Sequence, residues 1–247
     1  MRFLLLWLCA VCCNAQALTL RLCTFDRALY PYTMPDGSGL AQQLLRRTGK
    51  GLQIDVNNMI APRARCLALL QSGEVDALVA AFLPERMEYG AYPMTGEQPD
   101  ARTALAVVRF MVYRRRGSNI GWDGQHFSNL GQQPVGVPLG FIHEAMLRKL
   151  GAVIDGGGLG SEQNFDKLAQ NRLAAVVALE EEGKPLIELK YREQIEALPF
   201  PLHQTPLYLL VNRMYYIANK QKIELYWSAL RQRREAPDYR QGMLPLK

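Results

Sequence analysis

Histidine is scarce in this chain, and the motifs of common hydrolytic and nucleotide-dependent enzymes are missing. The three histidines, His126, His143 and His203, lie far apart, and none stands at metal-ligand spacing from another histidine, a cysteine or a carboxylate. The sequence also contains no Gly-x-Ser-x-Gly elbow, no Walker loop and no His-Glu-x-x-His helix. We therefore expect no metal site, no cofactor and no catalytic residue, and we interpret the protein as something other than an enzyme.

Long apolar runs are absent beyond the first residues, so the rest of the sequence offers no candidate for a membrane-spanning helix. The N-terminus has the parts of a secretory signal peptide: the basic Arg2, the apolar run 3–11 and the cleavage pattern Ala15-Gln16-Ala17. We predict that residues 1–17 are removed and that the mature protein is exported and soluble. An uncleaved anchor, or a lipid attached at Cys12 or Cys13, is the alternative.

Cysteine is also scarce once the signal peptide is removed. Of the five cysteines, Cys9, Cys12 and Cys13 leave with residues 1–17, and Cys23 and Cys66 remain. Two cysteines in an oxidising compartment favour one disulfide bond. Two buried free thiols are the alternative.

The chain has only a small excess of positive over negative charge. The formal net charge of +6 comes with short basic clusters at 46–47, 114–116 and 231–234. Basic surfaces attract nucleic acid, anionic lipid or acidic ligands. No aromatic residues are interleaved with these clusters and no nucleic-acid motif accompanies them, so we expect solvated faces and no nucleic-acid partner.

The first half of the mature chain alternates between strand-like and helix-like segments. Alternation predicts a strand at 18–25, and the apolar run 75–82 predicts a strand buried on both faces. Glycines end both helical patterns. The expected order is strand 18–25, helix 40–48, strand 53–56, helix 62–73 and strand 75–82. Such a βαβαβ order favours a parallel sheet with crossover helices.

The second half repeats this organisation. Ser161 is the expected N-cap of one helix, and we interpret Gly156-Gly157-Gly158 as a flexible strand exit rather than a phosphate loop. The other expected elements are strands at 135–137, 152–154 and 173–179 and a helix at 141–150.

An internal match links the two halves. Residues 70–80 align without gaps on residues 168–178, and Gly73 meets Asn171. Glycine and asparagine are the residues that best tolerate a left-handed helix cap. We therefore expect two similarly built α/β lobes, each with a mainly parallel sheet flanked by helices.

Two segments are expected to cross between the lobes and act as a hinge. The strand-like run 104–113 leads to the second lobe, and 199–206 followed by 207–212 returns. A tail helix at about 221–234 would then pack on the first lobe. This predicts a discontinuous first lobe of residues 18–107 and 206–247 and a second lobe of residues 108–205.

Several segments together carry a resemblance to a known family. They are Tyr30-Pro31-Tyr32, Arg65-Cys66-Leu67 through Gln71 to Ala77, Pro84-Glu85-Arg86 with Tyr92-Pro93, and Val135 to Phe141. With them the mature chain resembles, over nearly its whole length, the type II periplasmic solute-binding proteins. The similarity is to the polar amino-acid (family 3) branch that serves ABC transporters.

The resemblance implies a location, a shape and a set of partners. It implies a periplasmic monomer with two lobes, a small-molecule ligand held in the cleft between them, and a membrane permease or receptor as protein partner. Similar proteins pair a cysteine of the first strand with the cysteine of an Arg-Cys-Leu helix, which favours a Cys23–Cys66 bond.

The resemblance also implies ligand-binding residues. Arg86 follows the 75–82 strand, and in similar proteins this arginine grips the ligand's carboxylate through two charge-assisted hydrogen bonds. Tyr30 and Tyr32 are candidate aromatic walls, although loop tyrosines beside proline also simply pack. Gly140 and Phe141 precede a helix whose N-terminal amides are candidate anion ligands, with an ordinary turn as the alternative.

The departures from the family pattern restrict the class of ligand that we expect. Ala80, Ala81 and Phe82 stand where amino-acid binders carry hydroxyl residues, and Gln43 stands where an acidic residue is usual. Leu179 stands where the binders carry the aspartate that holds the α-amino group. Glu180 is the adjacent candidate, although we expect 180–182 to be a solvated run. We therefore predict a carboxylate or other small anion with an apolar or aromatic body.

Three other functions remain open. The same fold serves ligand sensing for a membrane receptor. Some similar proteins are periplasmic dehydratases of cyclic acids, a function that needs an acid or base in the cleft, with Glu180 as the evident residue. The missing clamp residues are also compatible with a domain that has lost its ligand.

Overall fold

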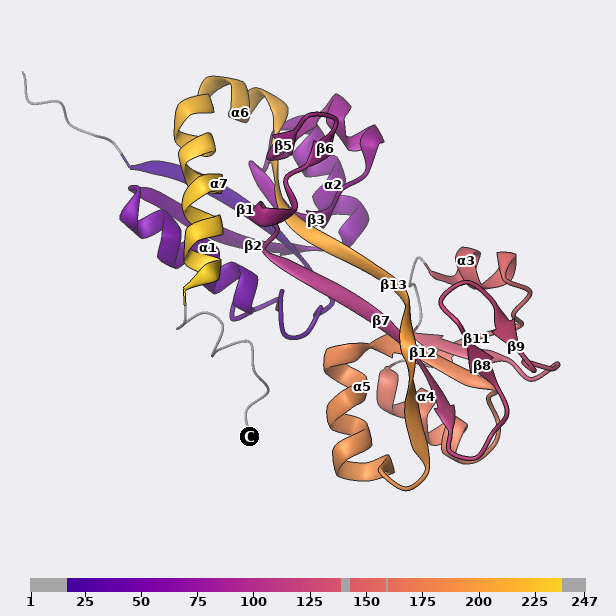
Figure 1. Cartoon of the computed structure of the whole chain (residues 1–247). Coiled ribbons are helices and arrows are strands. Elements are labelled where there is room, and N and C mark those ends of the chain that lie inside the picture. Colours follow the sequence, from indigo (N-terminus) through magenta and orange to yellow (C-terminus); the bar gives the residue numbers. More distant parts are fainter. Residues whose placement is uncertain (1–16, 139–142, 159, 237–247) are drawn as a thin grey trace, which may run out of the picture.

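The computed structural model describes residues 17–138, 143–158 and 160–236, and these form two α/β lobes connected by two long strands (Figure 1). The predicted signal peptide lies almost entirely outside the described residues. In the described ranges, no helix combines the length and apolar character that crossing a membrane would need.

The first lobe contains the predicted parallel sheet. Its strands are β1 (Leu18–Phe25), β2 (Ile54–Ala61) and β3 (Ala77–Ala81), in the order β3-β1-β2. The connecting helices, α1 (Leu40–Gly51) and α2 (Arg63–Ser72), cover opposite faces, because α1 shares one buried cluster with the sheet and α2 shares another. Both helices occur where the sequence predicts them.

The second lobe has the same organisation, with β10 (Val135–Pro138) lying between β11 (Ile154–Gly158) and β12 (Ala175–Leu179) in parallel pairing. Its helices are α3 (His143–Lys149), α4 (Ser161–Ala169) and α5 (Glu180–Leu186), and α5 continues into a π-helical turn, Ile187–Tyr191. Two expectations were wrong. Ser161 is the first residue of α4 rather than its N-cap, which is Gly160. The glycines 156–158 belong to β11, where Gly158 pairs with Pro138 of β10.

The lobes are joined by β7 (Ala106–Arg115) and β13 (Ile195–Asn212), which run antiparallel to each other. β12 pairs with β7 and β3 pairs with β13, so both lobes belong to one nine-stranded sheet in the order β11-β10-β12-β7-β13-β3-β1-β2, with β4 (Gly90–Ala91) pairing beside β13. The predicted return at 199–212 is a single strand that begins earlier. The boundaries at 107/108 and 205/206 stay a prediction.

Several short elements lie outside the main strands and helices. The turn η1 (Pro84–Glu88) follows β3, and η2 (Ala101–Thr103) precedes β7. Two short hairpins, β5 (Met94–Thr95) with β6 (Gln98–Pro99) and β8 (Gly121–Trp122) with β9 (Phe127–Ser128), complete the strands.

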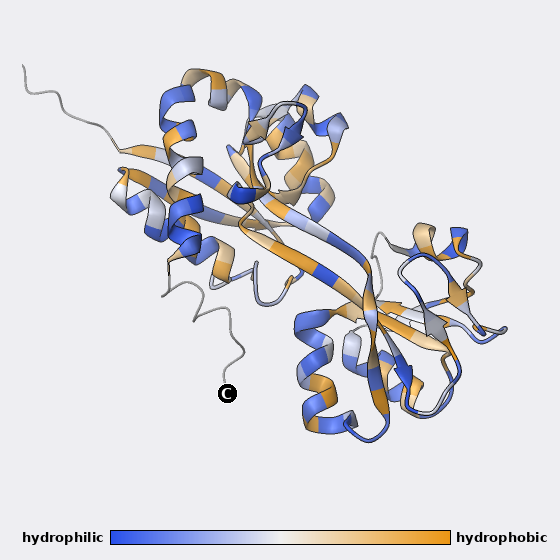
Figure 2. Ribbon diagram, viewed as in Figure 1, coloured by the Kyte–Doolittle hydropathy of each residue, from blue (hydrophilic) through white to orange (hydrophobic). Residues whose placement is uncertain are grey.

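The tail of the chain returns to the first lobe, as predicted. After the short helix α6 (Arg213–Ala218), α7 (Lys220–Glu235) buries side chains at helical spacing: Ile223, Tyr226, Trp227 and Leu230. They join the cluster that contains α1, and the Tyr226 hydroxyl donates to the Leu45 carbonyl at 2.6 Å. Figure 2 shows hydrophobic residues concentrated along the strands and many hydrophilic residues on α7 and α5.

The internal match is confirmed by the backbone. Gly73 has φ of +79° and Asn171 has φ of +59°, so both residues end their helices in the left-handed region. Leu70 and Leu168, which occupy the same place in the two segments, are both fully buried. A shared local pattern therefore builds the same helix-to-strand turn in each lobe.

Candidate functional site

The candidate site begins at one edge of the first lobe. Because β1, β2 and β3 are parallel, their carboxyl ends meet at the same edge, which is where open α/β sheets bind ligands. Ala81 at the end of β3 pairs with Leu207, which pairs with Ala106 at the start of β7. This edge therefore faces the direction in which the crossing strands leave for the second lobe.

Arg86 is buried at this edge, on the turn η1, and only 5% of it is exposed. Its Nη1 donates to the Ala81 carbonyl at 2.9 Å, and the Tyr92 hydroxyl donates to the same oxygen at 2.9 Å. None of the described carboxylates forms an ion pair with it. A buried guanidinium held by backbone, without a counter-charge, is a suitable group for a ligand anion.

The residues beside Arg86 form an aromatic cluster. Phe82 meets Tyr92 edge to face with ring centroids 5.1 Å apart, and Tyr92 meets Tyr208 at 6.2 Å. Burial raises the pKa of Tyr92, while the nearby positive charge of Arg86 acts in the opposite direction. Ala81 is half-buried at the end of β3. The edge therefore offers a cation beside an apolar wall.

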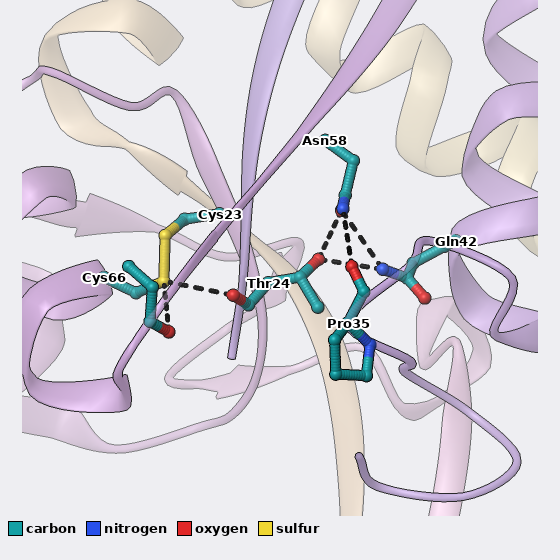
Figure 3. The surroundings of a disulfide bond; sticks show 7 residues. Cys23, Thr24, Pro35, Gln42, Asn58 and Cys66 are labelled. Atoms are coloured by element: carbon teal, nitrogen blue, oxygen red, sulfur yellow. Dashed lines mark hydrogen bonds between the residues drawn. A yellow bond between two sulfur atoms is a disulfide. The ribbon is translucent and has the colours of Figure 1, made fainter. Parts of the chain in front are cut away.

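The loop with the two tyrosines is anchored by a residue that the sequence analysis did not single out. Gln42 is fully buried; its Nε2 donates to Thr24 Oγ1 at 2.8 Å and to Asn58 Oδ1 at 3.1 Å, and its Oε1 accepts the Met34 amide at 2.8 Å (Figure 3). The signal was a glutamine three residues after the N-cap Gly39, the spacing of a capping box.

The two tyrosines behave differently. Tyr30 is half exposed, whereas Tyr32 is buried with β7, β12 and β13 side chains. The Tyr32 hydroxyl donates to the carboxylate of Glu181 on α5, so this residue connects the loop after β1 to the second lobe. Tyr32 therefore bridges the lobes.

The acidic run of the second lobe is not a solvated run, contrary to expectation. Glu180 pairs with Arg109 of β7 at 2.9 Å, Glu181 accepts from Tyr32, and Glu182 accepts from the Ser161 hydroxyl. The second carboxylate oxygen of Glu181 is buried without a hydrogen-bond partner. The sequence placed these residues on the surface because it could not show that α5 begins directly at the end of β12.

Leu179 is buried at the end of β12, so the position that holds the aspartate in amino-acid binders is part of the core here. Glu180, its predicted substitute, lies one residue later, and its carboxylate is ion-paired with Arg109. Gly140 and Phe141 lie outside the described residues.

The disulfide predicted by resemblance is present. Cys23 of β1 and Cys66 of α2 are bonded, with their Cα atoms 5.6 Å apart (Figure 3). In the chain-entropy model, a closed loop of this size stabilises the fold by about 4 kcal/mol. The bond holds the first turn of α2 over β1, beside the candidate site.

Arg63, which the sequence analysis missed, opens α2 directly after β2. Desolvation lowers the pKa of its guanidinium, and the positive charge of Arg86 lowers it further. The signal was an arginine immediately after the helix-initiating Pro62. Among the described residues, no group of three or more histidines, cysteines and carboxylates is arranged to hold a metal ion.

Comparison with solved structures identifies the fold. A histidine kinase sensor domain with similarity to periplasmic binding proteins superposes with a TM-score of 0.64 at 16% identity, over 92% of this chain and 96% of that chain. The GluR0 ligand-binding core of Nostoc punctiforme, solved with L-glutamate, gives 0.63 at 14% identity, over 90% and 96%. The unliganded, open L-cystine solute receptor of Neisseria gonorrhoeae gives 0.59 at 16% identity, over 87% and 86%.

These similarities, with the two parallel-stranded lobes and their crossing strands, define the chain as a protein of the type II periplasmic-binding-protein fold. No family model matches the sequence, and no curated protein matches it.

Proposed function

We propose that this protein is a periplasmic solute-binding protein that captures a small anion between its lobes and delivers it to an ABC-type membrane transporter. The observation that carries the proposal is the buried guanidinium of Arg86, which stands at the carboxyl edge of the first lobe without a carboxylate partner among the described residues. The disulfide is consistent with an oxidising compartment.

The surroundings of Arg86 support a carboxylate with an apolar or aromatic body. Phe82 and Tyr92 supply ring surface beside the guanidinium. On the second lobe, Leu179 offers no charge and Glu180 is already paired with Arg109, so neither serves a ligand ammonium. An ordinary α-amino acid is therefore not the expected ligand.

Ligand sensing is the second candidate function. The observation that favours it is the similarity to a histidine kinase sensor domain over nearly the full length of both chains. Both functions share the same capture step and differ in the membrane protein that meets the closed form. The enzyme alternative is less well supported, because Arg109 holds the Glu180 carboxylate that would act as acid or base.

A thermal-shift screen followed by calorimetric titration tests the capture step. Aromatic and aliphatic carboxylates, small inorganic anions and amino acids are added to wild type, Arg86→Gln, Arg86→Lys and the control Arg102→Gln, whose arginine pairs with Asp100 at the surface. A ligand at 100 times its dissociation constant should stabilise wild type by about 2.7 kcal/mol.

We expect Arg86→Gln to weaken carboxylate binding by about 100-fold, because both charge-assisted bonds are lost. Arg86→Lys keeps the charge but loses the planar fork, so it should bind with intermediate affinity. Arg102→Gln should match wild type. Carboxylate binding that survives Arg86→Gln in a folded protein contradicts the proposal, and micromolar binding of an ordinary amino acid would contradict the ligand class and point to Glu181.

A further inference from the structure

Two arginines follow strands that end at the carboxyl edge of the first lobe. Arg63 opens α2 after β2, and Arg86 follows β3, on either side of β1 in the strand order. The Cys23–Cys66 bond holds the first turn of α2 against β1. Cys66 of α2 and Met87, the neighbour of Arg86, belong to the same cluster of buried side chains.

No protein carboxylate neutralises this pair within the described ranges. Asp26 and Glu85, the acidic residues that flank the edge in sequence, are exposed and pair with neither guanidinium. By contrast, Arg65 of the same helical turn has a carboxylate, Glu74, at 3.9 Å. Neither guanidinium therefore has a counter-charge from these residues. Desolvation lowers the pKa of Arg63, and the positive charge of Arg86 lowers it further.

The backbone adds to this positive field. The first turn of α2 contains no acidic residue, and its N-cap, Pro62, has no side chain able to accept a hydrogen bond. The exposed amides and the helix dipole at this end both favour negative charge. Arg86, 95% buried and without a carboxylate partner among the described residues, follows β3 at the same edge of the sheet.

We propose that Arg63 and Arg86 together bind a dianion, so that the ligand carries two negative charges on neighbouring groups or on one head group. This deepens the proposed function and rests on it. A monoanion would neutralise only one of the two guanidiniums, whereas a dianion neutralises both. In this arrangement Arg86 sets the position of the ligand, and Arg63 selects its charge.

The test compares ligands that share a four-carbon chain or a phenyl ring but differ in charge: butanoate with succinate, and benzoate with phenylphosphonate, at pH 8 and 0.15 M ionic strength. Sulfate against chloride at equal ionic strength supplies an inorganic dianion. Binding is measured by calorimetry and thermal shift for wild type, Arg63→Gln, Arg86→Gln and the control Arg65→Gln. The control removes the same charge from the same helical turn.

We expect wild type to bind at least one dianion about 10-fold tighter than its matched monoanion, because a second charge-assisted contact forms. Arg63→Gln should erase that preference and leave monoanion affinity within about 2-fold, and Arg65→Gln should change neither. A preference that persists in Arg63→Gln, or no dianion preference in wild type, overturns the inference.

The two proposals fail in different ways. Monoanion binding that depends on Arg86, without any dianion preference that depends on Arg63, overturns only the dianion inference. Binding of either charge class that ignores Arg86→Gln overturns the proposed function. The exposed position of Arg63 keeps its variant foldable, and circular dichroism with the melting temperature verifies this.

Discussion

Single side chains set the electrostatics of this protein in two ways, as fixed structural pairs and as unpaired charges. Asp76 is 2% exposed, and its carboxylate accepts from the Arg21 amide at 2.7 Å and from the Arg21 guanidinium at 2.6 and 2.9 Å. The acidic residue of the Gly-x-Val-Asp pattern is therefore structural, since it ties the start of β3 to β1. Arg86 has no such partner among the described residues. This difference distinguishes a structural ion pair from a candidate ligand-binding charge.

Glu182 leads to a pH prediction at this scale. Burial raises the pKa of its carboxyl, the charge of Glu181 adds to the effect, and the Ser161 hydrogen bond opposes it. Because the folded pKa exceeds the unfolded pKa of about 4.3, its contribution to stability is complete below that value. It is lost as pH rises through the folded pKa.

We therefore expect the melting temperature of Glu182→Gln, relative to that of wild type, to increase as the pH rises from 4 to 8. The exposed Glu188→Gln on the same helical segment is the control, and it should follow wild type throughout. Scanning calorimetry at half-unit pH steps measures this. A constant difference between Glu182→Gln and wild type would show that the buried carboxyl does not titrate as described.

At the scale of elements, the helix α5 carries the acidic run 180–182 in its first turn and packs against the core of the second lobe. It begins directly after β12 and packs on Tyr113 of β7. The ring of Tyr113 packs against the ring of Phe165 on α4, with the two ring centroids 4.9 Å apart. A Cβ on Gly183 would overlap the Tyr113 ring. Gly183 is therefore required by close approach and not by backbone conformation.

Gly183→Ala should destabilise the protein despite the better helix propensity of alanine. Propensity favours alanine by up to about 1 kcal/mol, whereas overpacking a closed core costs roughly 1–3 kcal/mol. Gly51→Ala at the end of α1 is the matched control, since a Cβ there meets nothing within 4 Å. Urea unfolding should show a net loss of about 1–2 kcal/mol for Gly183→Ala and none for Gly51→Ala. Equal or greater stability of Gly183→Ala contradicts the packing argument.

For the whole molecule, the two crossing strands make a hinge the expected route of motion. β7 and β13 are the strands of the sheet that span both lobes, and β13 changes register with β7 around Pro201. The Tyr32–Glu181 hydrogen bond adds a side-chain connection between the loop after β1 and α5 of the second lobe. A ligand that contacts both lobes would favour the arrangement in which this contact forms.

Tyr32→Phe should therefore weaken ligand binding without removing any proposed ligand contact to Arg86. A hydrogen bond to a charged group contributes about 1.5–3 kcal/mol, so the affinity should fall roughly 10-fold or more. Small-angle scattering should show a smaller ligand-induced decrease in radius of gyration. Tyr30→Phe, two residues away and half exposed, is the control. Unchanged affinity and compaction in Tyr32→Phe would mean that the contact does not stabilise the closed form.

Much of the fold was predictable because its signals are local. The strand 18–25, the tail helix and the paired left-handed caps at Gly73 and Asn171 all follow from periodicity and residue type, and they occur as predicted. The helix α5 was missed because Gly183 and Pro185 lower its propensity, and packing against Tyr113 overrides that preference.

The sequence by itself determined the two α/β lobes, because hydrophobic periodicity and turn residues act over a few neighbours along the chain. Only the tertiary structure decided which charges meet. Arg63 and Arg86 belong to different elements and lie at one edge of the first lobe because its parallel strands end there, while Glu181 reaches Tyr32 across the lobes. Electrostatic interactions depend on distance in space, and that distance is set by strand order and crossing strands rather than by position in the sequence.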